Sequence, residues 1–401
     1  MTWQEESVVE RGEDGRMTNK RIKALFVFGT RPEAIKMAPV IKECGRNKIK
    51  FDPCICVTAQ HREMLDQVLE LFNIKPHYDL NIMTERQSLP SLMSSVLLKV
   101  TEVMKKETPG LVIVQGDTIT TFAAAQAAYY LKIPVAHIEA GLRTQNKYSP
   151  FPEEINRCLT GVIADFNFAP TERARRNLLE EGLEKSSIFV TGNTVIDALE
   201  WVQARHNRSG VRDKWRQWFL SKHNIPLSNG SRTILVTGHR RESFGEEFKK
   251  ICKALKILAR NNSDIQIVYP VHLNPNVQEP VYSILGDVDN VHLIPPLDYE
   301  PFVFLMSQSD LVLTDSGGIQ EEAPTLGVPV LVMRDTSERP EGIEAGSARL
   351  VGTNVDTIVN ETQKLLKNEN EYKRMSNAVN IYGDGTASKM IVRILSEHLE
   401  V

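Results

Sequence analysis

Short apolar runs alternate with longer amphipathic stretches through the first half of the chain. The apolar runs end in glycine or polar residues and predict strands at 23–29, 51–58, 111–116, 134–140 and 187–192. Apolar residues at helical spacing predict helices at 33–44, 61–73, 88–107, 119–131, 152–164 and 171–182. Strands that are apolar throughout and separated by helices are typical of a parallel sheet covered on both faces. The pattern therefore predicts an α/β domain.

The same alternation restarts in the second half of the chain. Further apolar runs predict strands at 232–238, 264–270, 290–294, 310–314 and 328–333. Between the halves, the segment at about 196–230 is polar, contains three tryptophans and shows no strand pattern, so we interpret it as the junction. We predict two Rossmann-like domains, at 21–195 and 196–385, that face each other across a cleft at the carboxyl ends of their strands.

Composition excludes several classes of protein. The chain has 401 residues, enough for two cores, and its 48 Lys and Arg residues against 51 Asp and Glu residues give a net charge of −3. That balance predicts no binding to nucleic acid or to an anionic membrane. No apolar run approaches the roughly 18 residues that span a membrane.

The terminal segment and the cysteines indicate where the protein works. Residues 1–20 are polar and acidic and lack the apolar core of a signal peptide, so we predict a disordered tail, with Met17 as a candidate start. The five cysteines contain no CxxC pair. We interpret them as reduced core thiols of a cytoplasmic protein.

Polar clusters follow nearly every predicted strand. Charged residues, glycines and histidines collect at 29–36, 58–63, 115–118, 137–143, 237–245, 270–275 and 314–318. Each cluster alone is explained by the solvation of a loop. Open α/β sheets bind ligands at the carboxyl ends of their strands, so the clusters together predict a ligand in the cleft.

One cluster, TDSGGIQEEAP at 314–324, joins a predicted strand to a helix. Its Ser316–Gly318 turn places backbone N–H groups at the start of the helix, and the glycines allow a bulky anion to approach closely, which predicts a phosphate site. Glu321 and Glu322 follow in the first turn, where carboxylates also favour the helix dipole. A carboxylate beside a diphosphate can accept hydrogen bonds from a ribose diol, and we assign this role to Glu322.

The positive charge that a diphosphate needs must come from other loops. Arg31 and Lys36 follow the first predicted strand, and Arg339 follows the last apolar run. His239 and Arg240 follow the sixth predicted strand. Each of these cations, taken alone, is also explained as a solvated surface charge.

Acidic residues border the same cleft. Asp117 and Glu139 each follow a strand in the first half, and Glu153 lies in the first turn of a helix begun by Pro152. Arg157 follows Glu153 by four residues, so a helix-dipole charge and a surface ion pair also explain these two. Acids at strand ends that face a cleft suit general acid–base chemistry on a carbon acid or a hydroxyl.

Several binding motifs are absent from the sequence. No GxGxxG follows the first strand, which argues against a nicotinamide site, and no GxxxxGK[ST] forms an ATP-binding loop. Asp287 and Asp289 form a lone DxD in a turn before a strand, and we do not interpret it as a metal site. No His and Cys residues have the spacing of a zinc site. The sequence therefore predicts no metal and no cofactor.

Ten motifs carry a resemblance to a known family: GTRPEAIKMAP, TAQHREMLDQV, GDT, HIEAGLRT, SPFPEEINR, TGNTVIDAL, GHRRESFG, PVHLNP, TDSGGIQEEAP and RDTSERPE. In order and spacing, across about 22–395, they resemble the bacterial non-hydrolysing UDP-N-acetylglucosamine 2-epimerases. The resemblance implies a glycosyltransferase-B-like fold whose C-terminal helix, at about 386–401, packs back on the first domain. It also implies a homodimer that interconverts UDP-GlcNAc and UDP-ManNAc without metal or nicotinamide, supplying precursors for surface polysaccharide.

The resemblance implies roles for individual residues as well. The contacts to UDP would be Arg31, Lys36, His239, Phe302, Ser316, Gly317, Gly318, Glu322 and Arg339, with the backbone near Leu297 against the uracil. The catalytic residues would be Asp117, Glu139, Glu153, Arg157 and His239. A second, activating UDP-GlcNAc would bind at Gln60, Arg86, Arg240 and His272.

The chemistry of the sugar C2 atom indicates the mechanism. Its hydrogen is too weakly acidic for direct removal, but departure of UDP from C1 acidifies it, so anti elimination gives a 2-acetamidoglucal to which UDP adds back. Two acid–base groups are needed on opposite faces of C2, and the sequence does not decide which of the three acids serves which face. The alternatives are a hydrolysing 2-epimerase that releases ManNAc and UDP, a UDP-sugar glycosyltransferase, and a sensor that binds without turnover.

Overall fold

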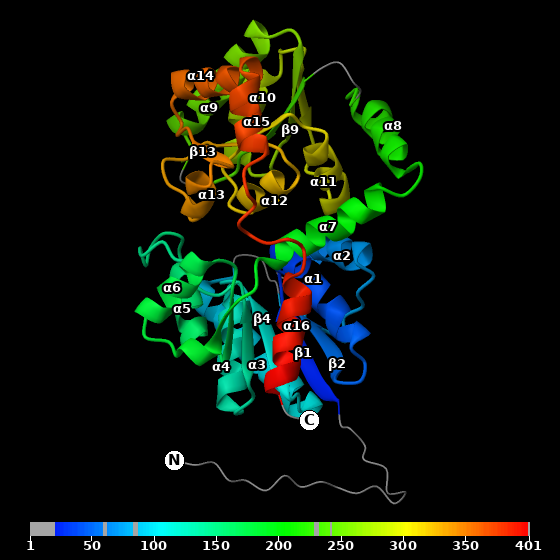
Figure 1. The fold of residues 1–401 in the computed structure, drawn as a ribbon, viewed down its shortest axis with the longest axis vertical. Coiled ribbons are helices and arrows are strands. Elements are labelled where there is room, and N and C mark those ends of the chain that lie inside the picture. The colour runs from blue at the N-terminus through cyan, green and yellow to red at the C-terminus, as the bar shows by residue number, and fades with distance from the viewer. Residues whose placement is uncertain (1–20, 59–61, 83–86, 228–231, 241–242, 400–401) are drawn as a thin grey trace, which may run out of the picture.

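Two parallel sheets form the two lobes of the protein in a computed structural model (Figure 1). The structure describes residues 21–58, 62–82, 87–227, 232–240 and 243–399. The predicted tail, Gln60 and Arg86 lie outside these ranges. Within the described ranges, no helix combines the length and the apolar character needed to cross a membrane.

The first sheet has seven strands among the described residues, all paired in parallel, in the order β3-β2-β1-β4-β5-β6-β7. Their bounds are β1 (Ile22–Phe28), β2 (Phe51–Val57), β3 (Tyr78–Asp79), β4 (Leu111–Gln115), β5 (Val135–Ile138), β6 (Phe166–Ala169) and β7 (Ile188–Val190). The helices of this lobe are α1 (Arg31–Arg46), α2 (Arg62–Leu71), α3 (Leu89–Glu107), α4 (Ile119–Tyr130), α5 (Glu153–Ile163) and α6 (Glu172–Glu180).

The second sheet has six strands in the described part of the chain, again parallel, in the order β10-β9-β8-β11-β12-β13. Their bounds are β8 (Arg232–Thr237), β9 (Ile265–Pro270), β10 (Val291–Ile294), β11 (Leu311–Thr314), β12 (Val330–Val332) and β13 (Ala348–Leu350). Its helices are α9 (Glu246–Asn261), α10 (Pro275–Leu285), α11 (Tyr299–Ser307), α12 (Ile319–Thr325), α13 (Pro340–Glu344), α14 (Val355–Lys367) and α15 (Glu369–Ser376).

Both faces of each sheet are apolar because helices cover both faces. In β1, Phe26 and Phe28 pack with residues of α1. Leu25 and Val27, which alternate with them along the strand, pack with residues of α3 and α4. In β11, Val312 faces the cluster that contains α11 and α12, and its neighbour Leu313 faces the cluster that contains α9 and α10. This arrangement confirms the predicted α/β class with parallel sheets.

Three strands of the structure were not predicted. The strand β3 has two residues and β13 has three, too few for a periodic pattern. The strand β6 reads Phe-Asn-Phe-Ala, and its buried Asn167 interrupts the apolar run. The Asn167 Nδ2 donates to the carbonyls of Gly161 and Ala164, each at 3.3 Å, so the donor of this buried side chain is satisfied, whereas its Oδ1 finds no partner among the described residues.

Two helices occupy the predicted junction, α7 (Thr194–His206) and α8 (Val211–His223), and no strand interrupts the described residues there. Figure 1 shows α7 between the lobes, and it packs against α1 on one side and α11 and α12 on the other. The last helix, α16 (Ala387–His398), packs on α1 and α7. One apolar cluster therefore runs from the first sheet through α7 to the second sheet.

The cysteines divide into two groups. Cys44, Cys54, Cys56 and Cys252 are buried, as predicted, and all five thiols are free. Cys158 is only half-buried on α5, where its Sγ lies 3.9 Å from Glu181 Oε1, so the prediction of a core thiol was wrong there. The helix places Cys158 next to the exposed Leu159 and near Glu181, so this position is partly open to solvent.

Candidate active site

A cavity of about 390 Å³ lies between the lobes, bounded by the start of α1 and by loops at the carboxyl ends of β8 to β11. A volume of this order suits a small-molecule ligand. The predicted residues that line it are Arg31, Lys36, His239, His272, Leu297, Phe302, Ser316, Gly318 and Glu322. Tyr299, which the sequence did not single out, lines it as well.

A second cavity of about 390 Å³ lies beside the loops at 142–146 and 336–341. Two of its arginines are already paired with carboxylates, Arg143 with Glu181 at 2.6 Å and Arg173 with Glu344 at 2.5 Å. An anion bound there would compete with these ion pairs. The first cavity is therefore the better candidate for a charged ligand.

Arg31 supplies an uncommitted positive charge to the first cavity. Its Nη1 donates to the carbonyl of Leu297 at 3.2 Å, and among the described residues it forms no ion pair. Burial lowers the pKa of Arg31, so its charge is held in a poorly solvated place without a carboxylate in contact. A phosphate group would relieve that cost through a charge-assisted hydrogen bond.

The turn from β11 to α12 presents backbone donors to the cavity. The N–H of Ser316 is turned inward and donates to Thr314 Oγ1 at 2.9 Å. The N–H groups of Gly317, Gly318 and Ile319 have no acceptor among the described residues, as expected at the start of a helix. A Cβ atom at Gly317 would lie 2.9 Å from Arg339 Nη1, which explains glycine at that position.

Glu322 lies in the cavity wall, on the first turn of α12. Its Oε1 accepts a hydrogen bond from the Tyr299 hydroxyl at 2.7 Å. Burial raises the pKa of Glu322 to about 7, although the Tyr299 hydrogen bond and the charges of Lys36 and Arg31 oppose the rise. The carboxyl group can therefore change its protonation near neutral pH.

The adjacent Glu321 points away from Glu322, so the two glutamates of the motif have separate surroundings. Its Oε1 accepts from Arg339 Nε at 2.6 Å, and its Oε2 accepts from Asn193 Nδ2 at 2.5 Å. Burial raises the pKa of Glu321 and outweighs the opposing charge of Arg339. Arg339, predicted as a phosphate contact, is thus already paired with a buried carboxylate.

Glu139 follows β5 and is buried next to Lys36, which lines the cavity. Its Oε2 accepts from Lys36 Nζ at 2.5 Å and from Asn193 Nδ2 at 2.7 Å, and its Oε1 accepts from Gln115 Nε2 at 3.1 Å. Burial alone would raise the pKa of Glu139, but the charges of Lys36 and Arg339 outweigh burial and lower it. Glu139 is therefore a carboxylate at neutral pH.

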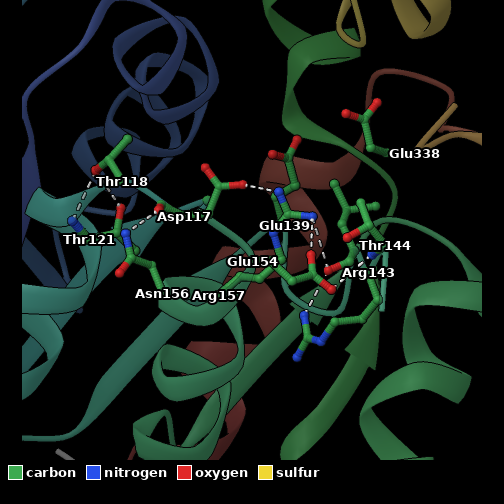
Figure 2. A network of polar contacts seen from close by, with 12 residues as sticks. Asp117, Thr118, Thr121, Glu139, Arg143, Thr144, Glu154, Asn156, Arg157 and Glu338 are labelled. Carbon is green, nitrogen blue, oxygen red and sulfur yellow. Dashed lines mark hydrogen bonds and ion pairs between the residues drawn. The ribbon is translucent and has the colours of Figure 1, made fainter. Parts of the chain in front are cut away.

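Arg157 joins two carboxylates in the first lobe. Figure 2 shows its guanidinium between Asp117 and Glu154, with contacts to both. The Glu154 Oε1 atom also accepts from the backbone N–H groups of Thr144 and Gln145, each at 2.9 Å. Arg157 is buried, so the alternative of a surface pair with Glu153 does not describe it.

Glu153 has surroundings unlike those of Glu139. Its Oε2 is buried and finds no hydrogen-bond partner among the described residues. Burial raises the pKa of Glu153, and the nearby Asp117 carboxylate raises it further, against the weaker effects of Arg157 and Arg240. The two acids thus have pKa values shifted in opposite directions, a pattern typical of acid–base sites.

His239 is held at the cavity by Asp315, which is fully buried at the end of β11. Asp315 Oδ2 accepts from the backbone N–H groups of His239 and Arg240 at 2.7 and 2.8 Å. Asp315 Oδ1 lies 3.2 Å from Nδ1 of the His239 ring. Burial would raise the pKa of Asp315, but these hydrogen bonds and the histidine lower it, so Asp315 can orient the ring as a carboxylate.

One residue of the predicted second site, His272, lines this cavity, and Arg240 directly follows the lining residue His239. The rings of His272 and His239 stack with their centroids 5.6 Å apart. Arg240 Nη2 lies 3.6 Å from Glu338 Oε1, and the pKa of Glu338 falls to about 2 because Arg334 and the other arginines outweigh its burial. The structure thus places His272 at this cavity and Arg240 beside Glu338, whereas Gln60 and Arg86 lie outside the described residues.

The DxD turn has another explanation than metal binding. Asp287 Oδ1 accepts from Lys256 Nζ at 2.7 Å, and Arg260 lies 3.7 Å away. Within the described ranges, no three His, Cys, Asp or Glu side chains gather closely enough to hold a metal ion.

Sequence reasoning missed four residues that organise the cavity: Asp315, Asn193, Glu321 and Tyr299. Asp315 and Asn193 were inside quoted motifs at strand ends, so their positions were available as a signal. Glu321 was explained by the helix dipole alone. Tyr299 had no signal, because its contact with Glu322 depends on how α11 and α12 pack.

Comparisons with known proteins agree with the fold and the motifs. A sequence model of the family described as UDP-N-acetylglucosamine 2-epimerase matches residues 42–396. The chain is 56% identical over 388 residues to a probable UDP-N-acetylglucosamine 2-epimerase of Ralstonia nicotianae, covering 94% of this chain and 99% of that protein. It is 55% identical over 377 residues to the UDP-N-acetylglucosamine 2-epimerase of Escherichia coli K12, with the same coverage.

Solved structures give the same result. The UDP-GlcNAc 2-epimerase of Neisseria meningitidis, solved bound to UDP-GlcNAc, superimposes with a TM-score of 0.90 at 50% identity, over 94% of this chain and 100% of that one. The two parallel sheets are therefore those of the glycosyltransferase-B-like fold. By its motifs, its fold and its sequence identity over nearly the whole chain, the protein belongs to the UDP-N-acetylglucosamine 2-epimerase family.

Proposed function

We propose that this chain interconverts UDP-GlcNAc and UDP-ManNAc without net hydrolysis, by eliminating UDP and adding it back to a 2-acetamidoglucal. The observation that carries the proposal is the contrast between Glu139, held as a carboxylate, and Glu153, whose proton is retained to higher pH, around one cleft. The relative from Neisseria, bound to UDP-GlcNAc by its description, supports the choice of substrate.

The second lobe, together with Arg31 at the start of α1 in the first lobe, holds the UDP group in this proposal. The free N–H groups of Gly317 to Ile319 and the charge of Arg31 receive the diphosphate, as the start of a helix does for phosphates generally. Glu322 accepts hydrogen bonds from the ribose hydroxyls, and the backbone near Leu297 contacts the uracil. His239, oriented by Asp315, faces the bond from C1 to the leaving oxygen and stabilises the departing diphosphate.

The first lobe supplies the proton transfers. As the C1–O bond breaks, its electron pair leaves with UDP, and the C2–H electron pair forms the C1–C2 double bond. Starting from UDP-GlcNAc, Glu139 accepts the C2 proton, and protonated Glu153 gives a proton to the opposite face of C2 as UDP returns to C1. The charges of Asp117 and Arg157 set the electrostatic potential at Glu153. In the reverse reaction, the two glutamates exchange roles.

A proton NMR time course of UDP-GlcNAc in deuterated buffer tests this function. We expect UDP-ManNAc to form, with deuterium at C2 of both nucleotide sugars and hydrogen retained at C3. Accumulation of free ManNAc and UDP in equal amounts would indicate the hydrolysing enzyme instead. Transfer of the sugar only after an acceptor is added would indicate a glycosyltransferase, and epimerisation without exchange at C2 would reject the elimination mechanism.

Binding of a second UDP-GlcNAc, near Arg240 and His272, is part of the proposal. Its support is that His272 lines the cavity and that Arg240 directly follows His239, another lining residue. Velocity against UDP-GlcNAc should be sigmoidal, and the reaction from UDP-ManNAc alone should accelerate when a trace of UDP-GlcNAc is added. Hyperbolic kinetics in both directions would remove the second site.

A homodimer formed through the helices of the first lobe is also proposed. Exposed apolar side chains on α5, Ile155, Leu159 and Val162, share one helix face, and α3 next to α4 exposes Leu98. A second copy would cover this surface. Light scattering should give a dimer that Val162→Glu dissociates, while Ile49→Glu, at an exposed apolar residue outside these helices, leaves it intact. A monomeric wild type would contradict the proposal.

The proposed setting is the cytoplasm, where the substrate would be available. The free thiols of all five cysteines fit a reducing compartment.

A further inference from the structure

Asn193 occupies the point where the chain passes from the first lobe to α7. It is 1% exposed, and its Oδ1 accepts from the N–H of Val195 at 3.1 Å, which caps the start of α7. Its backbone N–H donates to the carbonyl of Tyr382 at 2.6 Å, in the segment that returns to the first lobe. At the point where the chain passes between the lobes, both the side-chain oxygen and the backbone N–H of Asn193 are therefore hydrogen-bonded.

The side-chain amide of Asn193 donates to one carboxylate from each lobe. Nδ2 lies 2.7 Å from Oε2 of Glu139, at the end of β5, and 2.5 Å from Oε2 of Glu321, on α12. An amide nitrogen carries two hydrogens, so each carboxylate can receive one. Both carboxylates are buried, where a hydrogen bond to a charged group has its largest effect.

The charges around Asn193 are balanced without it. Lys36 pairs with Glu139 at 2.5 Å, and Arg339 pairs with Glu321 at 2.6 Å. A neutral donor can join the two ion pairs without changing that balance. An acid at position 193 would add a third carboxylate to the cluster, and a basic residue would leave an excess positive charge.

We propose that Asn193 is a positioning residue that fixes the Glu139 carboxylate relative to α12. This helix begins at the proposed phosphate turn and carries Glu322, so the bridge sets how far the proton acceptor lies from a nucleotide held by the other lobe. The proposal rests on the proposed function, in which Glu139 is the proton acceptor. A misplacement of about 1 Å at a reacting group can cost roughly 100-fold in rate.

Two variants separate this role from helix capping. Serine and aspartate both retain an oxygen that can cap α7, and both remove the amide donor. We expect Asn193→Ser to lower kcat by about 10- to 100-fold and to leave the Kd of UDP within about threefold. We expect Asn193→Asp to lower kcat further and to move the acid limb of the pH profile upward, because the added charge raises the pKa of Glu139.

A swap of the donor and acceptor tests the bridge directly. The double variant Asn193→Asp with Glu321→Gln keeps the number of charges and restores a donor and an acceptor between positions 193 and 321. We expect it to recover part of the kcat lost in Asn193→Asp. The matched control is Asn354→Ser, which changes an exposed cap whose Oδ1 accepts from Thr357 N at 3.0 Å on α14, and it should leave kcat unchanged.

The outcomes distinguish this inference from the proposed function. A wild type that shows no C2 exchange rejects the function, whatever the variants do. An epimerising wild type with an Asn193→Ser variant of unchanged kcat and unchanged pH profile reduces Asn193 to a helix cap. If the Ser variant does not fold, Glu321→Gln replaces it as the test, because it leaves the cap of α7 intact. We expect Glu321→Gln to lower kcat and to retain UDP affinity. A normal kcat in this variant would overturn the proposed bridge.

Discussion

The two walls of the cleft use different physical means. The second-lobe wall presents backbone N–H groups and a histidine oriented by Asp315, which are fixed dipoles with little net charge of their own. The first-lobe side holds ion pairs, Glu139 with Lys36, which lines the cavity, and Asp117 with Arg157. The dipoles keep their orientation as the pH changes, whereas paired acids can exchange protons. In the second-lobe wall, Glu322 has a pKa of about 7. The difference fits the proposal that the nucleotide binds mainly to the second lobe, with Arg31 from the first lobe, and that proton transfer takes place in the first lobe.

The largest effect should come from Glu139. We expect Glu139→Gln to lower turnover by about 10²–10⁴, because the amide cannot accept the C2 proton. UDP affinity should change little, because the proposed nucleotide contacts other than Arg31 and Lys36 lie in the other lobe. NMR turnover and calorimetry measure the two quantities. Glu172→Gln on α6, an exposed position, is the control. An equal loss of UDP affinity would break the division between the walls.

Glu153 should show the opposite dependence on pH. Because its pKa is raised above 4.5, its acid form persists to higher pH, and turnover of UDP-GlcNAc should fall as the pH rises through that raised pKa. Glu153→Gln should remove this limb and lower turnover by about 10²–10⁴, and Asp117→Asn should cost a similar factor. Near-normal turnover of the Gln variant would return Glu153 to a helix-dipole role.

A smaller effect on both quantities is expected from Asp315. Asp315→Asn retains one acceptor oxygen but turns an N–H₂ group toward the donors of His239 and Arg240. We expect turnover to fall by about 10- to 100-fold and UDP affinity to weaken as well, since the histidine is no longer held. Asp289→Asn, in an exposed turn, is the control. A change in turnover alone would place Asp315 with the proton-transfer residues.

Glu322 should affect binding only. Glu322→Ala should weaken UDP binding by about 1.5–3 kcal/mol, the usual contribution of a hydrogen bond to a charged group. Since the pKa of Glu322 is about 7, wild-type affinity should decline as the pH falls below 7 and the carboxylate gains a proton. Tyr299→Phe removes a hydrogen bond that lowers this pKa, so the decline should begin at higher pH. Calorimetry at several pH values measures both, and a pH-independent affinity would contradict the ribose contact.

The smallest effect is expected from chelation. Asp287 is occupied by Lys256 at 2.7 Å, and the described side chains offer no other cluster for a metal. Dialysis against EDTA should leave turnover within error of the untreated enzyme. If EDTA abolished activity and a divalent cation restored it, the enzyme would need a metal ion that the comparison of the two walls leaves out.

Much of the fold was predictable because it depends on local periodicity. Apolar runs such as Leu111–Gln115 and Leu311–Thr314 are buried on both faces, and burial on both faces leaves a continuous pattern in sequence. The loops after these strands were also predictable as ligand positions, because strand direction fixes the edge to which they belong. The short strands β3 and β13 and the strand with Asn167 left no such pattern.

The motifs and their order determined the family and the residues at the cleft. Sequence did not determine which carboxylates would be charged, because a pKa depends on neighbours distant in the chain. Glu321 and Glu322 are adjacent, yet one is turned to Arg339 and Asn193 and the other to Tyr299. The charge of Lys36, 103 positions away, lowers the pKa of Glu139. Burial raises the pKa of Glu153, whose Oε2 finds no partner among the described residues. Those contacts exist only after the lobes and helices have packed, so tertiary structure alone decided the acid–base character of this site.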